Sequence, residues 1–179
     1  SVPVPLDMHY NADSFSWESK PGDFTDHSHA FPAEYAPPEG RLFDAAVEFA
    51  FPSTANGARN AVHTAGQTVA VDFNEAVGLA FLAYAINGDK DTNLTLVEAD
   101  GKRTEVPLRI SNWCTPPVFG EAITLSAPYR YDGLGRAVPP PYVYRQTVLF
   151  GRVVNLKEIV LPRQPDLLVF AITVIPDAP

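Results

Sequence analysis

The chain has 179 residues, of which 46% are hydrophobic, and its 13 Lys and Arg stand against 21 Asp and Glu. This length and composition predict a single domain over residues 1–179 with one hydrophobic core. The net charge of −8 argues against nucleic acid and anionic membrane surfaces as partners, because their phosphate groups would be repelled. No apolar run reaches the ~20 residues that a membrane-spanning helix needs.

The first ten residues lack the basic and apolar regions of a signal peptide, although a cleaved leader could have preceded Ser1. A single cysteine, Cys114, cannot form an internal disulfide, so cysteine usage leaves the cellular compartment open. Asn93-Leu94-Thr95 is a glycosylation sequon, which matters only in a secreted protein.

Residues 10–40 form a long irregular segment, rich in Asp, Ser, His, Pro and aromatic residues and without a sustained period. Segments of this length inside a compact domain are either functional or disordered. Its aromatic anchors argue against disorder. They are Tyr10, Phe15, Trp17, Phe24, Phe31 and Tyr35. Trp17 is the best candidate for an exposed aromatic platform, because a loop aromatic has no periodic reason to be buried.

A possible metal site lies in the same segment. His27 and His29 would point to one side of a strand, and with Glu34 they resemble the first metal-binding motif of cupins, which implies a Zn, Fe or Mn enzyme. The only later histidine is His63, in a different context, and Pro32 interrupts the strand that would present the ligands. The alternative is two histidines held in a polar loop.

Hard oxygen donors in this segment raise the option of Ca²⁺. They are Asn11, Asp13, Asp23 and Asp26, and their spacing fits no compact calcium loop. The alternative is that these side chains cap backbone N–H groups in turns, as Asp and Asn commonly do. No other cofactor is expected.

The remainder of the chain favours strands, and its 18 prolines argue against long helices. Residues 94–110 alternate apolar and polar residues around Asp100-Gly101, which predicts a tight hairpin. The apolar segment 75–88 predicts a central strand buried on both faces. Further strands are predicted at 41–51, 67–73, 122–127, 142–150, 156–162 and 167–175. Residues 176–179 are expected to be a linker end.

The stretch 126–146 concentrates tyrosines and arginines in a segment that Gly and Pro interrupt too often for a regular strand or helix. Tyr129 and Tyr131 are two residues apart, as are Tyr142 and Tyr144, so each pair shares one face of an extended chain. Tyrosine rings can stack on the C–H faces of sugars while charged neighbours bond the hydroxyls. The alternative, more frequent on a sheet face, is that the rings belong to the core.

Signals for nucleophilic catalysis are lacking in the sequence. It contains no Gly-x-Ser-x-Gly elbow, and Cys114 follows Trp113 in a context typical of a buried small residue. Paired carboxylates for glycoside hydrolysis leave no sequence signature, since the two partners usually lie on separate strands. We therefore do not expect an enzyme active site within this chain.

Eight short motifs, in order, resemble a β-sandwich module appended to secreted glycosidases and related to galactose-binding-like carbohydrate-binding modules. They are YNAD (10–13), GDF (22–24), FPAE (31–34), AINGD (85–89), SNWC (111–114), PYRYDG (128–133), VYRQTV (143–148) and LPRQPDLLVFAITV (161–174). The resemblance implies an all-β, jelly-roll sandwich of about eight to ten antiparallel strands, secreted, that holds a parent catalytic domain on a polysaccharide or glycan. Here "TDHSHA" replaces the glycine-rich run that follows GDF in the related modules.

These arguments predict a non-catalytic carbohydrate-binding module, with the cupin-like metal enzyme and a purely structural accessory domain as alternatives. The predicted binding residues fall into three groups. Trp17, Tyr131 and Tyr142 would supply aromatic surface, Asn87, Asp89 and Asp132 would bond hydroxyls, and Arg130 and Arg145 would be charged donors.

Overall fold

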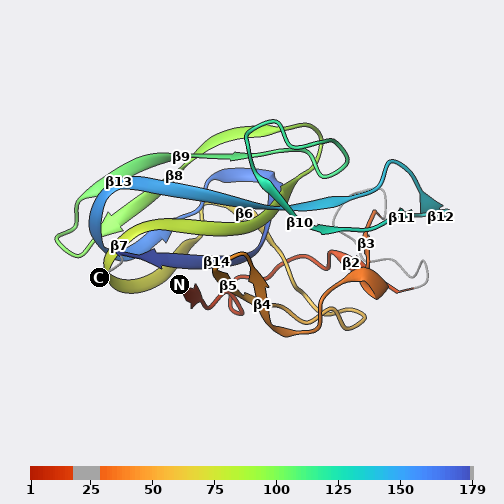
Figure 1. Cartoon of the computed structure of the whole chain (residues 1–179), viewed down its shortest axis with the longest axis horizontal. Coiled ribbons are helices and arrows are strands. Elements are labelled where there is room, and N and C mark those ends of the chain that lie inside the picture. The colour runs from red at the N-terminus through yellow and green to blue at the C-terminus, as the bar shows by residue number, and fades with distance from the viewer. Residues whose placement is uncertain (18–28, 178–179) are drawn as a thin grey trace.

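The computed structural model describes residues 1–17 and 29–177, and within them the fold is built from β-strands (Figure 1). The one helical element among these residues is a short 3-10 turn, η1 (Ala33–Tyr35). The predicted all-β class is therefore confirmed.

Fourteen strands are defined in the described residues. They are β1 (Val2–Val4), β2 (Phe15–Ser16), β3 (Phe31–Pro32), β4 (Gly40–Asp44), β5 (Val47–Phe51), β6 (Val62–Ala65), β7 (Thr68–Ala85), β8 (Lys90–Glu98), β9 (Arg103–Ile110), β10 (Ala122–Ser126), β11 (Arg130–Asp132), β12 (Gly135–Ala137), β13 (Tyr142–Val160) and β14 (Arg163–Pro176).

Eight of the strands form one antiparallel sheet, with the order β1-β14-β7-β13-β8-β9. In addition β10 pairs with β13, and β6 pairs with β14. The remaining strands form three two-stranded ladders, of which β4–β5 and β11–β12 are antiparallel and β2–β3 is parallel. The sequence predicted about eight to ten strands in all, whereas the described residues contain fourteen, eight of them in the main sheet.

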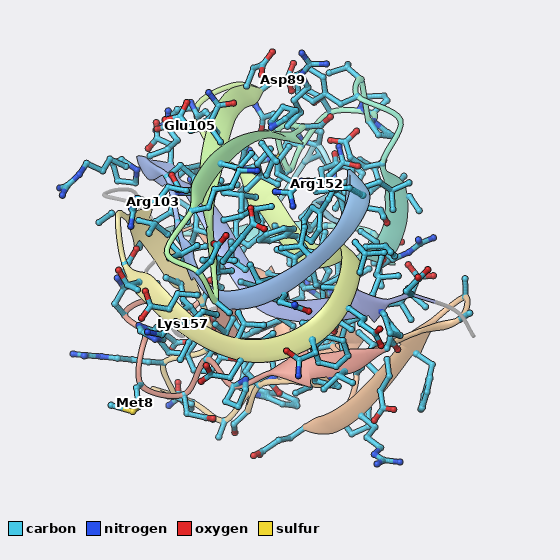
Figure 2. The ribbon with its side chains drawn as sticks, turned by 90° about the vertical axis from the view of Figure 1, so that its left-hand side faces the viewer. Met8, Asp89, Arg103, Glu105, Arg152 and Lys157 are labelled. Atoms are coloured by element: carbon cyan, nitrogen blue, oxygen red, sulfur yellow. The ribbon has the colours of Figure 1, made fainter. Side chains whose placement is uncertain are left out.

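The two longest strands bend, and the bend curls the sheet around the core. The first part of β13 pairs with β10 and with the second half of β7, whereas its last residues pair with β8 and with the first half of β7. Between them the register shifts from Leu149 to Val154, beside Gly151, whose φ is 68°. Figure 2, which looks at the molecule from the left-hand side of Figure 1, shows the long strands curving around the side chains inside.

Two predicted strands of residues 142–162 are therefore one continuous strand, β13, and the predicted strands at 67–73 and 75–88 are joined in β7. The residues that interrupt the apolar pattern are Asn74 in β7 and Gly151 and Asn155 in β13. They lie at irregularities of the pairing within these strands rather than at strand ends. The expected central strand is confirmed, because β7 is buried without a break from Leu79 to Ala85.

Two other segments contain a hairpin where the sequence prediction had none. Residues 41–51 were expected to form one strand, but Ala45 adopts a φ of 52° and the chain turns there between β4 and β5. The stretch 126–146, expected to be too irregular for strands, holds the short hairpin β11–β12. The predicted β8–β9 hairpin is confirmed, with Gly101 in its turn at a φ of 87°.

The core is centred on a cluster of aromatic side chains from the N-terminal segment and the main sheet. The ring of Phe170 in β14 stacks on Phe15 at a centroid distance of 5.2 Å and also contacts Phe51 and Tyr84. Strand β5, which carries Phe51, lies against β1 and β14. These contacts attach the N-terminal ladders to the main sheet.

The C-terminal residues are held by the sheet as far as they are described. Pro176 is the last residue of β14, and the N–H of Asp177 donates to the carbonyl of Glu75 at 2.7 Å. The prediction of a linker end is therefore wrong for these two residues, and residues 178–179 lie outside the described part of the chain.

Candidate functional site

A pocket of about 620 Å³ opens at the end of the molecule that carries the β11–β12 hairpin, on the right in Figure 1. Its walls come from three segments far apart in the sequence, namely the residue after β2, the turn η1, and the chain around β11 and β12. The lining residues are Trp17, Glu34, Tyr35, Tyr129, Tyr131, Gly135 and Arg136.

The hairpin positions three of these side chains. Tyr129 and Tyr131 lie two residues apart on an extended backbone, and their rings pack edge to face at a centroid distance of 5.5 Å. Gly135 adopts a φ of 127°, which disfavours other residues, and the carboxylate of Asp132 accepts the N–H of Leu134 at 2.8 Å in the same turn. The turn places Arg136 directly opposite Tyr131.

The turn η1 brings a carboxylate to the two phenols. Both the Tyr129 hydroxyl and the Tyr131 hydroxyl donate to the same oxygen of Glu34, Oε1, each at 2.5 Å. Partial burial raises the pKa of Glu34, but these two hydrogen bonds and the nearby charge of Arg136 outweigh it, so that the pKa lies below its ordinary value. The carboxylate is therefore ionised, and the phenols act as donors.

Arg136 and Tyr35 pack against the ring of Tyr129. The Arg136 guanidinium lies 4.3 Å from the ring centroid, which is a cation–π contact. Tyr35 meets the same ring edge to face, at 5.7 Å and 89°, and remains 46% exposed. The pocket thus contains an open aromatic ring, one carboxylate and one guanidinium.

Trp17 supplies a second open ring. Its side chain is 42% exposed, and its indole N–H donates to the carbonyl of Thr54 at 2.8 Å. The prediction that Trp17 is an exposed aromatic is confirmed. Tyr131, the other predicted stacking residue, is only 3% exposed, so that prediction is wrong: its ring is packed inward and its hydroxyl is committed to Glu34.

Asn87 and Asp89, predicted to bond sugar hydroxyls, lie outside this pocket, in the turn between β7 and β8. Asn87 adopts a φ of 55°, and its amide donates to Asp166 at 3.3 Å. The Asp89 carboxylate accepts the backbone N–H of Asn112 at 2.7 Å. Both side chains therefore fix local backbone, although both remain exposed.

The remaining predicted residues also make structural contacts outside the pocket lining. Arg130 alternates with the two tyrosines, and its guanidinium lies 5.9 Å from the Trp113 ring and donates to the carbonyl of Pro139. Arg145 forms an ion pair with Asp44 at 2.8 Å.

Tyr142 is half-buried beside Tyr144, at a centroid distance of 6.3 Å, and its backbone N–H donates to the Trp113 carbonyl. Asp132 caps its own turn. The predicted binding residues therefore do not form one surface: of the eight, the pocket contains Trp17 and Tyr131.

The proposed metal ligands are described only in part, because His27 lies outside the described residues. The ring of His29 lies 6.1 Å from that of Trp113, and Glu34 is engaged by the two phenols. His63 approaches the carbonyl of Pro165 through Nδ1, at 2.6 Å. Residues 1–17 and 29–177 contain no group of three or more His, Cys, Asp or Glu side chains that could hold a metal ion.

The two described members of the calcium set behave as turn residues. Asp13 accepts from the backbone of Phe15 and Gly57 and from the side chain of Asn60, while burial raises its pKa. Asn11 exchanges two hydrogen bonds with the backbone of His63. Asp23 and Asp26 lie outside the described residues.

The sequence did not predict that Arg136 belongs to the site, nor that Glu34 and Tyr35 lie beside Tyr129 and Tyr131. The usable signal was the i, i+2 spacing of Tyr129 and Tyr131, which the structure confirms as a contacting pair. Burial raises the pKa of the Cys114 thiol to about 11, which disfavours the thiolate form that acts as a nucleophile. No helix in the described ranges is both long and apolar enough to cross a membrane.

Comparison with protein families assigns the fold. A model of the AziU2-like beta-sandwich domain matches residues 1–178, and the chain therefore belongs to this family. No curated protein matches the sequence. The β-sandwich implied by the sequence resemblance is thus confirmed, while its glycan-binding role stays a prediction.

Proposed function

Taking the chain as a member of the AziU2-like β-sandwich family, we propose that it is a non-catalytic carbohydrate-binding domain whose site is the pocket beside the β11–β12 hairpin. The observation that carries the proposal is the joint presence of two open aromatic rings, Trp17 and Tyr35, with one carboxylate and one guanidinium in a single pocket.

The chemistry of this pocket suits a sugar ring. The apolar C–H face of a pyranose packs on an aromatic ring, and its hydroxyls require hydrogen-bond partners at the rim. Trp17 is held by its bond to Thr54, so little side-chain entropy is lost on binding. Glu34 supplies an acceptor and Arg136 supplies donors. A volume of about 620 Å³ accommodates one or two sugar units.

The electrostatics of the pocket favour binding over catalysis. A general acid or base works best when its pKa lies near the working pH. The pKa of Glu34 is lowered. The pKa of Tyr129 is raised mainly by its bond to Glu34, and the pKa of Tyr131 is raised by burial and by its own bond to Glu34. None of the three groups is thus tuned to exchange a proton near neutral pH.

The wider role in the proposal is to hold a parent glycosidase on its polysaccharide outside the cell. The sequence resemblance to accessory modules of secreted glycosidases supports this role. The sequon residue Asn93 is exposed on β8, where an attached glycan would be accommodated. Neither a metal nor another cofactor is required by the proposed binding mode.

Affinity electrophoresis in gels that contain single polysaccharides tests the proposal. The wild-type protein should be retarded by at least one of them, and Trp17→Ala should restore most of the free mobility. Phe43→Ala is the matched control, because Phe43 is 61% exposed on β4 but does not line the pocket. Equal retardation of the wild type and Trp17→Ala, or no retardation across a broad panel, would contradict the proposal.

A purely structural accessory domain is the second candidate, and an exposed apolar patch favours it. Leu149 is 68% exposed and Val153 is 47% exposed, beside Val77 and Arg152. Arg152 faces the viewer in Figure 2, at the end of the molecule opposite β11 and β12. A bracing role predicts that Leu149→Lys weakens association with an adjoining catalytic domain, measured by co-elution, while no glycan is bound.

A further inference from the structure

We infer that the pocket selects an uncharged saccharide with adjacent hydroxyl groups, bound between the free carboxylate oxygen of Glu34 and the guanidinium of Arg136. This inference rests on the proposed carbohydrate-binding function and names the class of glycan that the site takes. It depends on how the pocket already uses its own donors and acceptors.

Glu34 is half committed to the protein. Both phenols donate to Oε1, and the backbone N–H of Glu34 itself also bonds the carboxylate, but in residues 1–17 and 29–177 no side chain donates to the other oxygen, Oε2. The two bonds fix the carboxylate, so that Oε2 is presented as an oriented acceptor in the wall of the pocket. A ligand hydroxyl can donate to it without displacing a protein group.

Arg136 supplies the complementary donors. Its guanidinium lies over the Tyr129 ring, 4.3 Å from the centroid, and also bonds the Tyr131 side chain, but it forms no ion pair within the described part of the chain. A guanidinium carries five N–H donors in a planar fork. A pair of adjacent sugar hydroxyls can therefore accept from Arg136 and donate to Glu34 at the same time, which a lone hydroxyl or an apolar ligand cannot do.

The charges in and around the pocket exclude acidic glycans. A ligand carboxylate or sulfate drawn to Arg136 would come close to the ionised Glu34, and like charges at such distances repel. The chain as a whole carries a net charge of −8, which opposes the approach of a polyanion. The carboxylate and the guanidinium balance each other, so a neutral ligand meets no net charge within the pocket.

A glycan array with matched neutral, uronate-containing and sulfated members tests this inference on the full chain. Binding is expected on neutral members only, and affinity should change less than twofold between about 0.05 and about 0.5 M NaCl, because no net charge is neutralised. Preferential binding of acidic glycans, or a steep loss of affinity with salt, would overturn the inference while leaving glycan binding itself intact.

Two substitutions test the roles of the charged residues on the best neutral ligand. Glu34→Gln keeps an oxygen for the two phenols but puts an NH₂ donor in place of Oε2, so the fold should persist while affinity falls about tenfold or more. Arg136→Gln should cause a similar loss. Matched controls are Glu105→Gln and Arg103→Gln on β9, at the other end of the molecule (Figure 2). Unchanged affinity in either pocket variant would refute the role assigned to that residue.

These outcomes distinguish a failure of the proposed selectivity for neutral glycans from a failure of the proposed carbohydrate-binding function. If the array shows no bound glycan and Trp17→Ala has no effect on any retardation, the proposed function fails. If glycans bind and Trp17→Ala weakens that binding, but acidic members are preferred or Glu34→Gln leaves the affinity unchanged, only the selectivity argument fails. Near-ultraviolet circular dichroism of each variant establishes that the loss of binding is not a loss of fold.

Discussion

The Tyr129 hydroxyl and the Glu34 carboxylate, 95 positions apart in the sequence, meet at an oxygen–oxygen distance of 2.5 Å. This bond joins the turn η1 to the chain that leads into β11. Since Tyr131 donates to the same oxygen, the geometry of the pocket depends on a single acceptor atom. Removal of one phenol hydroxyl should therefore first change the pKa of the Glu34 carboxyl group.

Tyr129→Phe should raise the pKa of Glu34 toward its ordinary value of 4.5, because one of the two hydrogen bonds that stabilise the anion is lost. The measurement is a carbon-13 NMR titration of the Glu34 carboxyl group. Tyr35→Phe is the matched control, because the described structure shows Tyr35 in a ring contact with Tyr129 and not in a bond to Glu34. A Glu34 pKa that is equal in wild type and Tyr129→Phe would contradict the role given to this bond.

The same pair predicts a pH dependence of stability. Because the folded-state pKa of Glu34 lies below 4.5, its contribution is complete above that pH and is lost as the pH falls through the folded value. The wild type should therefore lose more free energy of unfolding than Glu34→Gln between about pH 7 and about pH 3. Urea unfolding at each pH measures the difference, and identical pH profiles for the two proteins would exclude this linkage.

Much of the strand content could be predicted from the sequence, because alternation and turn residues are local signals. The β8–β9 hairpin and the buried half of β7 are examples. The continuity of β13 could not be predicted, since the bulge around Gly151 resembles a strand end in the sequence and is distinguished only by its pairing partners.

The pocket could be predicted only in fragments. Trp17 was identified by its irregular surroundings, and the Tyr129–Tyr131 pair by its spacing. Their meeting with Glu34 and Arg136 depends on long-range packing, which a sequence period does not encode. Charged and polar residues near aromatic residues in the sequence were predicted to bind the ligand, but several of them stabilise the fold instead. Arg145, for example, forms an ion pair with Asp44.

Arg145→Gln should destabilise the domain without affecting glycan binding. Arg145 on β13 pairs with Asp44 on β4 at 2.8 Å, both side chains are mostly buried, and Thr124 donates to the same Asp44 oxygen at 2.5 Å. Removal of the cation leaves a partly buried carboxylate with one donor, at a cost of about 2 kcal/mol in the free energy of unfolding.

Arg109→Gln is the matched control for this ion pair. Its partner Asp91 lies at 3.1 Å, but both side chains are more than half exposed, so the cost should stay below about 0.5 kcal/mol. Equal costs for the two variants in urea unfolding, or a loss of glycan affinity in Arg145→Gln, would show that Arg145 does not have the structural role assigned to it.

Gly78→Ala should also destabilise the domain, because β7 and β13 approach each other closely at this residue. A Cβ atom on Gly78 would lie 2.7 Å from the carbonyl oxygen of Val148, a backbone atom that cannot turn aside. The strands would have to separate locally, and we expect a loss of about 1–3 kcal/mol in the free energy of unfolding. Thermal or urea unfolding measures it, and a wild-type transition midpoint would show that the strand spacing is wrong.

Phe170→Ala should cause the largest loss of stability among these variants, because Phe170 joins the two parts of the core. Its fully buried ring contacts Phe15, Phe51 and Tyr84, which come from β2, β5 and β7. Truncation removes the transfer energy of the ring and leaves a cavity, at a cost of about 3–5 kcal/mol. Phe43→Ala removes an equal side chain that is 61% exposed and should cost less than about 0.5 kcal/mol. The comparison is made by urea unfolding, with the dependence of the free energy of unfolding on urea concentration fitted separately for each variant. A cost for Phe170→Ala as small as that of the control would mean that the N-terminal ladders do not pack on the main sheet in solution.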